Sequence, residues 1–340
     1  MINRIKQYNC QLFRRNFSDS PSGLFYGKMG QCIYWYLQGR FFKEEVYNNR
    51  ADDILDEIYD ERFRNTKFDF ENGIIGVGLG LDALIEYGFV CGDRDEVFED
   101  IDDIVIRQLS FEFLDAEIGT PHAMATFLWA GIYLTKRMEH GDMAYRNRAI
   151  MRRALNEMMN KLGLMVVNKI PEEPILFAPF SYLTLVIYLF FLQLGKCNVC
   201  NEKIQRTIIV WIENKGMIVP RSMGHRLLLQ ILLEEIDKVQ QLNILSDYNR
   251  ILKTTSSLKV FVSDELRDAD INLKEGVSIL ALPFLHFNRL TGDEKSLIRQ
   301  KIENSCLWTF QGENRQKSLE LFDSLMGAVS VYMLLIKINE

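Results

Sequence analysis

The sequence is short of several features that would point to particular protein classes. Its 340 residues include only 7 prolines, 4 histidines and 6 cysteines, and the cysteines form no closely spaced framework. We therefore exclude a secreted disulfide scaffold and expect free thiols in a reducing cytoplasm. Acidic residues outnumber basic residues by 46 to 40, which gives a net charge of −6. This balance leaves no basic surplus for binding duplex nucleic acid.

Apolar runs suited to export or to a membrane are also missing. The residues after Met1 lack the apolar core of a signal peptide. Residues 175–195 carry no charge, but Pro179 interrupts them, and the 14 residues that remain at 181–194 are too few to cross a bilayer. We therefore expect a buried helix there, no membrane span and a cytoplasmic protein.

A repeated unit is present instead, in which a glycine-rich start precedes an apolar run. Gly27-Lys28-Met29-Gly30 begins one unit, and Gly73-Ile74-Ile75-Gly76 begins the next, 46 residues later. Ser324-Leu325-Met326-Gly327 begins the last. Weaker copies begin near four further positions: His122, Ser181, Arg221 and Gly276. Apolar runs at this spacing are typical of stacked helix pairs, so the sequence predicts seven helical hairpins.

Gly-Asp pairs give a second recurrent signal, at residues 92–93, 141–142 and 292–293. Glycine suits the left-handed residue that ends a helix, and aspartate suits the cap that begins the next. The segment after residue 93 carries an apolar stripe at helical spacing: Val97, Ile101, Ile104, Val105 and Leu109. No comparable run alternates with a period of two, so we predict an all-α protein in which residues 1–340 form a single domain.

Each hairpin is expected to pair an apolar inner helix with an outer helix that has one face in water. The first and last units both carry apolar helices without a polar capping face, so a closed ring fits better than an open superhelix. The predicted fold is an (α/α) toroid of about seven inner and seven outer helices, with a six-hairpin toroid as the alternative.

With these units in view, the chain resembles the lanthionine synthetase C-like family. The resemblance depends on residues 23–30, 72–76 and 324–327, and in repeat architecture it extends over essentially the whole chain. It implies an α-toroid with a site at one mouth of the ring, and a function in modifying or recognising a ribosomally made peptide. Enzymes of the family make lanthipeptide thioether rings by adding a cysteine thiol to a dehydrated Ser or Thr. A zinc ion held by two Cys and one His activates that thiol.

The positions that match the family's zinc ligands carry other residues in this sequence. Lys274-Glu275-Gly276 replaces a Cys-His-Gly triplet, residues 221–224 replace a Trp-Cys segment, and residues 178–181 lack the expected histidine. Zinc activation of a thiolate needs those ligands. We therefore expect no zinc cofactor, and a cyclase-like peptide-modifying protein or a pseudoenzyme that holds a peptide substrate or a modifying-enzyme partner.

The candidate site residues lie near the starts of the inner helices, where positive dipole ends would converge. His122 and Glu275 are the candidate acid/base pair for catalysis. The substrate-binding candidates at the same ends are Tyr26, Lys28, Glu71, Asn72, Arg221, His225, Lys274 and Asp323. The plainer interpretation of the acids among them is that of first-turn carboxylates at helix starts.

Other conspicuous residues have plain interpretations. Cys197 and Cys200 have the spacing of half a zinc site, but no second pair lies nearby, so we interpret them as ordinary turn cysteines, with a weak metal clip or a redox pair as the alternatives. We interpret His286 as a hydrogen-bonded core residue. The acid-rich segments 52–61 and 99–103 are interpreted as solvated outer faces.

Two other function classes fit the same helical pattern. An (α/α) toroid glycosidase or polysaccharide lyase needs two carboxylates roughly 5 to 10 Å apart and aromatic platforms for sugar. The sequence offers these candidates: the acids Glu71, Glu275 and Asp323, and the aromatics Tyr26 and Trp129. The third class is a helical interaction module without a small-molecule site.

Overall fold

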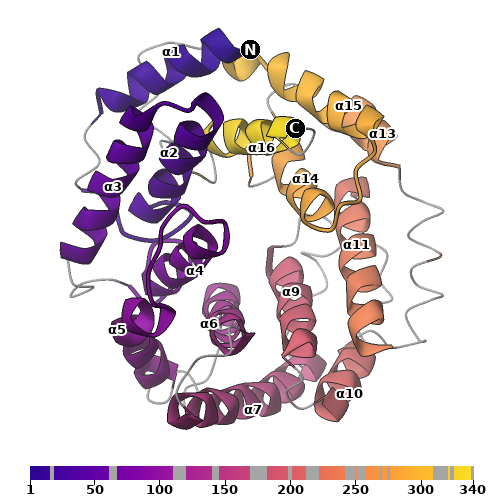
Figure 1. Ribbon diagram of the computed structural model, residues 1–340. Helices are drawn as coiled ribbons and strands as arrows, with labels where there is room; N and C mark the ends of the chain where they lie inside the picture. Colours follow the sequence, from indigo (N-terminus) through magenta and orange to yellow (C-terminus); the bar gives the residue numbers. More distant parts are fainter. Residues whose placement is uncertain are drawn as a thin grey trace. The chain divides into compact units, whose positions relative to one another are not determined.

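The computed structural model describes most of the chain. It leaves out these segments: 16–18, 61–66, 110–119, 140–144, 169–181, 198–200, 212–221, 242–249, 251–256, 268–269, 274–275, 309–320, 322–324 and 338–340. In the residues that remain, every regular element is a helix and none is a strand, which confirms the all-α prediction (Figure 1). None of these helices is long and apolar enough to span a membrane.

The chain divides into two compact units. The first unit combines residues 1–90 with residues 258–340, and the second comprises residues 91–257. Both ends of the chain therefore belong to the same unit. Whether the two units act as one domain stays a prediction.

The first unit contains two groups of helices that are far apart in the sequence. Its elements are α1 (Ile2–Phe13), α2 (Lys28–Phe42), α3 (Glu45–Asp60), α4 (Ile74–Glu86), α13 (Leu258–Val260), the π-helical turn η3 (Phe261–Glu265), α14 (Val277–His286), α15 (Gly292–Glu303), the 3-10 turn η4 (Cys306–Trp308) and α16 (Leu325–Lys337). α14, α16, α2 and α4 form a series in which each helix packs against the next. α3 packs against α2, and α15 packs against α14 and α16.

The second unit repeats this plan. Its elements are α5 (Arg94–Gln108), α6 (Pro121–Glu139), α7 (Tyr145–Asn168), α9 (Tyr182–Lys196), α10 (Asn201–Trp211) and α11 (Met223–Gln240). α6, α9 and α11 pack in series, α7 packs against α6 and α5, and α10 packs against α7 and α9. The two series together contain all seven apolar helices that the sequence predicts, and each helix begins within two residues of its expected start.

The partner helices have the amphipathic pattern expected of an outer layer. α3 buries Tyr47, Ala51, Ile54 and Ile58, which lie on one helical face, and its acidic residues lie elsewhere. Of the predicted stripe on α5, Ile101, Val105 and the C-cap residue Leu109 are fully buried, whereas Val97 and Ile104 are half-buried. Two further residues complete the buried face of α5: Phe98 and Asp102.

One backbone geometry recurs at three glycine-rich starts in the first unit. The amide of the first helical residue donates a hydrogen bond to the carbonyl oxygen seven residues earlier. These bonds are Lys28 to Pro21 (2.8 Å), Ile74 to Lys67 (2.9 Å) and Val277 to Asp270 (3.0 Å). The segment before each helix therefore folds back under its first turn, which is structural support for the predicted repeat.

This fold-back explains the glycines. A Cβ on Gly27, Gly73 or Gly276 would collide with the carbonyl six residues earlier. At three starts a second glycine, in the first turn of the helix, also has no room for a Cβ. The atom in the way is a backbone carbonyl oxygen: that of Leu24 at Gly30, of Phe70 at Gly76 and of Leu321 at Gly327. Because a side chain at these positions would need space that backbone atoms occupy, the glycines are required by close packing.

The Gly-Asp interpretation is right for Asp93, but wrong for Gly92, which is not left-handed, and for the pair at 292–293. Asp93 caps α5 by accepting hydrogen bonds from the amides of Asp95 and Glu96. At residues 292–293 the cap is Thr291, which forms a capping box with Glu294, so both members of the pair lie inside α15. The left-handed glycine is Gly88, with φ of 65°, after α4. The pair at 141–142 lies outside the described residues.

The core interpretation of His286 is also wrong. His286 is the last residue of α14 and is exposed, with its ring edge-on to Phe287 at 4.8 Å between centroids. The apolar residues on either side of His286 suggested a helix enclosed on all sides. α14 ends at this point, so the chain leaves the core one residue after the histidine.

Candidate functional site

Four predicted substrate-binding residues are near one another at the starts of α2 and α4. The segments 21–27 and 67–73, which precede these helices, are joined by backbone hydrogen bonds and are called the loop pair below. The bonds are Gly23 N to Asn72 O (2.9 Å), Leu24 N to Phe70 O (3.3 Å), Phe25 N to Glu71 O (3.0 Å) and Tyr26 N to Glu71 O (3.1 Å). The structure thus brings Tyr26, Glu71 and Asn72 together, and all three side chains are half-buried.

The loop pair is held down by apolar contacts that sequence reasoning did not single out. The rings of Phe25 and Phe70 meet edge to face at 4.7 Å between centroids. Leu24 lies against Gly30 and Gly76, where the absence of side chains lets the loop approach both helices. Asp69 adds a polar contact, because its carboxylate accepts a 2.6 Å hydrogen bond from the amide of Asn72. These contacts fix the backbone that carries the candidate side chains.

Lys28, the fourth candidate, is directed to the neighbouring helix. The residue is 2% exposed, and its ammonium nitrogen lies 3.3 Å from a carboxylate oxygen of Glu57 on α3. A buried ammonium needs such a partner, because leaving it unpaired costs several kcal/mol. The observed task of Lys28 is therefore to join the start of α2 to α3, and a role in binding substrate stays a prediction.

His225 in the second unit is buried in an unusual state. It lies in the first turn of α11, where its amide is 3.4 Å from the hydroxyl of the capping residue Ser222. The residue is 0% exposed, and neither ring nitrogen has a hydrogen-bond partner among the described residues. Burial lowers the pKa of His225 from 6.5 to about 4, so the imidazole is neutral at pH 7. It therefore offers a neutral donor and acceptor, not a positive charge.

Five predicted site residues remain, and the structure describes one of them. His122 lies in the first turn of α6 and is exposed. Arg221, Lys274, Glu275 and Asp323 lie outside the described residues. The acid/base pair of His122 and Glu275 consequently stays a prediction.

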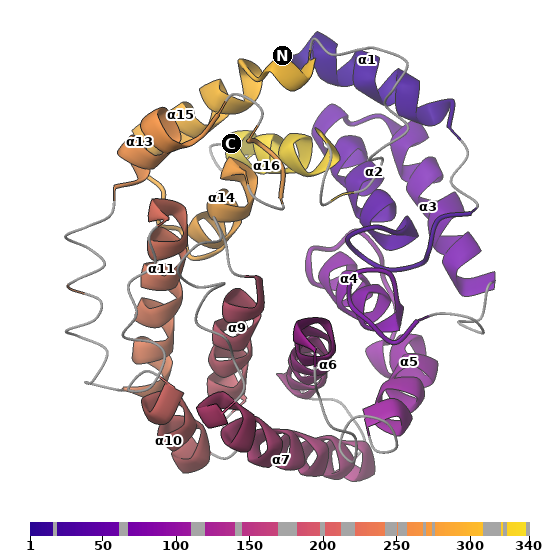
Figure 2. The same cartoon turned by 180° about the vertical axis from the view of Figure 1, so that it is seen from behind.

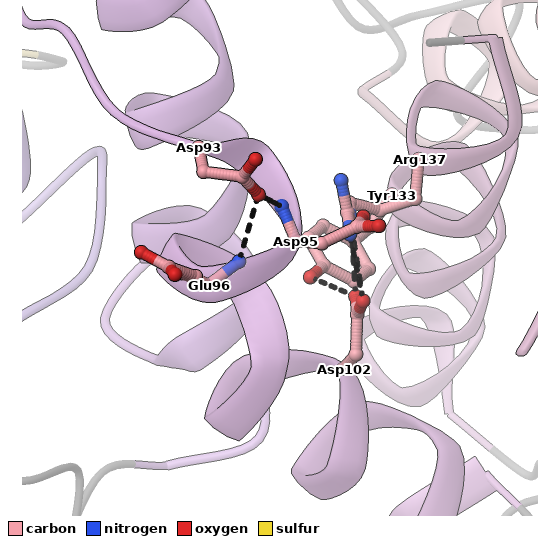
Figure 3. A network of polar contacts seen from close by, with 6 residues as sticks. All are labelled: Asp93, Asp95, Glu96, Asp102, Tyr133 and Arg137. Carbon is pink, nitrogen blue, oxygen red and sulfur yellow. Dashed lines mark hydrogen bonds and ion pairs between the residues drawn. The ribbon is translucent and has the colours of Figure 1, made fainter. Parts of the chain in front are cut away.

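A buried charge network in the second unit was missed by the sequence analysis (Figure 3). Asp102 on α5 accepts a 2.5 Å hydrogen bond from the hydroxyl of Tyr133 on α6. Nε of Arg137 donates to both oxygens of this carboxylate at 3.1 Å, and Nη2 donates to one of them at 3.0 Å. The side chains of Arg137 and Asp102 are only 2% and 6% exposed. This pairing fastens α5 to α6.

A second acid shares the arginine of this network. Asp95 accepts a 3.2 Å contact from Nη2 of Arg137, and its own side chain is 44% exposed. The ring of Phe98 lies 4.5 Å from the guanidinium carbon. Burial is the largest single influence and acts to lower the pKa of Arg137, but the hydrogen bonds and charges of Asp102, Tyr133 and Asp95 together raise it. Arg137 therefore keeps its positive charge at any physiological pH.

The structure describes only part of the segments that the resemblance matches to zinc positions, because residues 178–181, 221, 274 and 275 lie outside it, so the absence of zinc stays a prediction. Ser222 caps α11, Met223 accepts a 3.5 Å contact from the amide of Ser257, and Gly276 precedes α14. None of these is a thiolate or imidazole ligand. Across the described ranges, no three His, Cys, Asp or Glu side chains are grouped as a metal site would require.

Cys197 behaves as an ordinary packing residue. Its thiol donates a 3.1 Å hydrogen bond to the carbonyl oxygen of Thr135 on α6. Burial raises its pKa to about 12, which keeps the sulfur protonated and unreactive at neutral pH. Cys200 lies outside the described residues. At Cys197, the sequence interpretation as a plain turn cysteine agrees with this contact.

Comparisons with known proteins return nothing that resembles this chain. No family model matches it, and neither a curated protein nor a solved structure is significantly similar.

Proposed function

We propose that this chain is a lanthionine synthetase C-like α-toroid that recognises a ribosomally made peptide without zinc-dependent cyclisation. The single observation that carries the proposal is the repeated helix-start geometry at α2, α4 and α14. The glycine-rich motifs on which the resemblance depends coincide with these starts at α2 and α4. The motifs therefore have a common structural task.

Packing of the chain ends supports a closed ring. α16, the last helix of the repeat, packs against α2, the first, and α14 and α4 lie on either side of that pair. In an open superhelix each repeat contacts only its neighbours in sequence, so the first and last repeats stay apart.

The composition of the site favours binding over catalysis. Helix starts offer positive dipole ends, and the loop pair adds the half-buried side chains Tyr26, Glu71 and Asn72. Such groups bind the backbone and polar side chains of a peptide. Zinc-dependent activation of a thiol needs thiolate or imidazole ligands for the metal, and the matching positions supply neither. Recognition of the peptide is the function that these groups can perform.

The experiment uses the purified full chain and a synthetic peptide that contains one cysteine and one dehydroalanine. Calorimetry measures binding, and alkylation of the remaining free thiol followed by mass spectrometry measures ring formation. We expect binding, and ring formation no faster than in buffer, both with and without added zinc. Zinc-dependent acceleration would restore the cyclase function, and absence of binding would refute peptide recognition.

A matched pair of variants tests where the peptide binds. Tyr26→Ala removes a half-buried ring of the loop pair and is expected to weaken binding about tenfold, as loss of one well-packed aromatic contact does. Tyr87→Ala is the control, because Tyr87 lies at the opposite end of α4 and is 57% exposed. Equal weakening by both variants would remove the loop pair from the proposal. Turnover of chromogenic glycosides by the wild type would favour a hydrolase instead.

A further inference from the structure

One outer face of the second unit is rich in exposed cations. α7 exposes Arg152 and Arg153, and α10 exposes Lys203 and Arg206. These two helices pack together, as Figures 1 and 2 both show. The ammonium of Lys203 also contacts the side-chain oxygen of Asn160 on α7. We call these four exposed basic residues of the two adjacent helices, together with Asn160, the cationic row.

The basic groups of the cationic row are available to a partner. Arg152 and Arg206 make no hydrogen bond or ion pair with any residue that the structure describes. Arg153 is 2.9 Å from Glu157 on the same helix, yet its side chain remains 82% exposed. An exposed ion pair of this kind contributes little to stability, so Arg153 can exchange Glu157 for a carboxylate of a partner.

The cationic row contrasts with the rest of the protein. The whole chain has a net charge of −6. Within the same unit, α5 exposes an acidic stripe at helical spacing: Glu96, Glu99, Asp100 and Asp103. Positive charge is therefore gathered on α7 and α10 in a protein that is otherwise acidic, and a charge of this kind selects anionic partners.

We propose that the cationic row docks an acidic segment of a polypeptide partner. The guanidinium forks of Arg152, Arg153 and Arg206 match carboxylates in a bidentate geometry, and Lys203 adds a point charge. The carboxamide of Asn160, which contacts Lys203, suits a peptide bond, since it has both a donor and an acceptor.

A short acidic peptide fits this surface better than a nucleic acid. Binding of a duplex typically involves about 6 to 10 phosphate contacts, whereas the cationic row supplies four cations. A long polyanion would also experience the negative field of the acidic chain, which a short segment largely escapes because salt screens charges beyond about 10 Å.

The test measures fluorescence anisotropy of a labelled glutamate-rich peptide titrated with the full chain. Its reference peptide has glutamine in place of each glutamate. We expect saturable binding of the acidic peptide only, with an affinity that falls as salt rises. The double variant Arg152→Glu/Arg206→Glu should weaken binding by at least about tenfold, because two attractive pairs become repulsive. The conservative variant Arg152→Lys/Arg206→Lys should retain most of it.

The control variant is Arg107→Glu, which reverses an exposed arginine on the acidic helix α5. It should leave peptide binding unchanged. Equal weakening by Arg107→Glu would show that overall charge governs binding, and unaltered binding by the double variant would show that the peptide binds elsewhere. Tighter binding of a short DNA duplex or of anionic vesicles than of the peptide would also overturn the proposal. Circular dichroism confirms that each variant is folded.

Discussion

Replacement of His225 by leucine should remove a specific pH dependence from the stability of the protein. His225 is neutral and fully buried when folded, whereas the unfolded chain exposes it with a pKa near 6.5. Between about pH 4 and pH 6.5 the unfolded state therefore binds more protons, and the folded state loses stability as the pH falls. The full pKa difference between 6.5 and about 4 corresponds to a loss of about 3 kcal/mol in the free energy of unfolding. About 2 kcal/mol of this loss has occurred at pH 5.

The leucine variant escapes this penalty and also removes two buried ring nitrogens that have no partner among the described residues. We expect His225→Leu to equal or exceed the wild type in stability at pH 7. Its advantage should then grow by about 2 kcal/mol on going to pH 5. Urea unfolding followed by circular dichroism at both pH values measures the change. The control Leu228→Val, on the same helix, removes one buried methylene and should lower stability equally at both pH values. Parallel pH profiles for His225→Leu and the wild type would refute the reasoning.

Three further predictions concern packing and buried charge. Gly73→Ala should destabilise the fold by several kcal/mol in urea unfolding, because its Cβ would overlap a backbone carbonyl, whereas Gly292→Ala has open space and should be neutral or slightly stabilising. Asp102→Ala should cost about 3 to 5 kcal/mol, since it leaves Arg137 buried without its main partner; a loss under about 1 kcal/mol would show that water reaches the guanidinium. Lys28→Met should destabilise less than Glu57→Ala, because only the second removes the carboxylate beside an ammonium that stays buried.

The helices were predictable because each start has a local signal. The glycine at a helix start is required by a contact with a segment only seven residues earlier, so the signal is local in sequence. The apolar run that follows indicates that the helix is enclosed by its neighbours. The pattern of Gly292-Asp293 misled because two capping signals overlap there. Thr291 with Glu294 is a capping box, which satisfies two groups reciprocally, and it prevailed over a single aspartate cap.

The sequence predicted where the candidate site residues lie, but not the environment of their side chains. Nearness to a helix start correctly brought together Tyr26, Glu71 and Asn72, because the segments before α2 and α4 pair through their backbones. The environment of each side chain depends on residues far away in sequence, which the pattern does not encode. Lysine is typical of protein surfaces, yet Lys28 is buried and Glu57 on another helix gives its ammonium a carboxylate partner.

Asp102 is a second residue whose burial the sequence pattern did not predict. It stands in an acid-rich segment whose pattern indicated a solvated face, and its neighbours Asp100 and Asp103 are exposed as expected. Helical geometry turns Asp102 inward beside Ile101, and it is tolerated there only because Arg137 and Tyr133 on α6 supply hydrogen bonds. Those donors lie more than 30 residues along the chain. A buried acid can therefore be recognised from sequence only once the helix that contains its partners has been placed beside it.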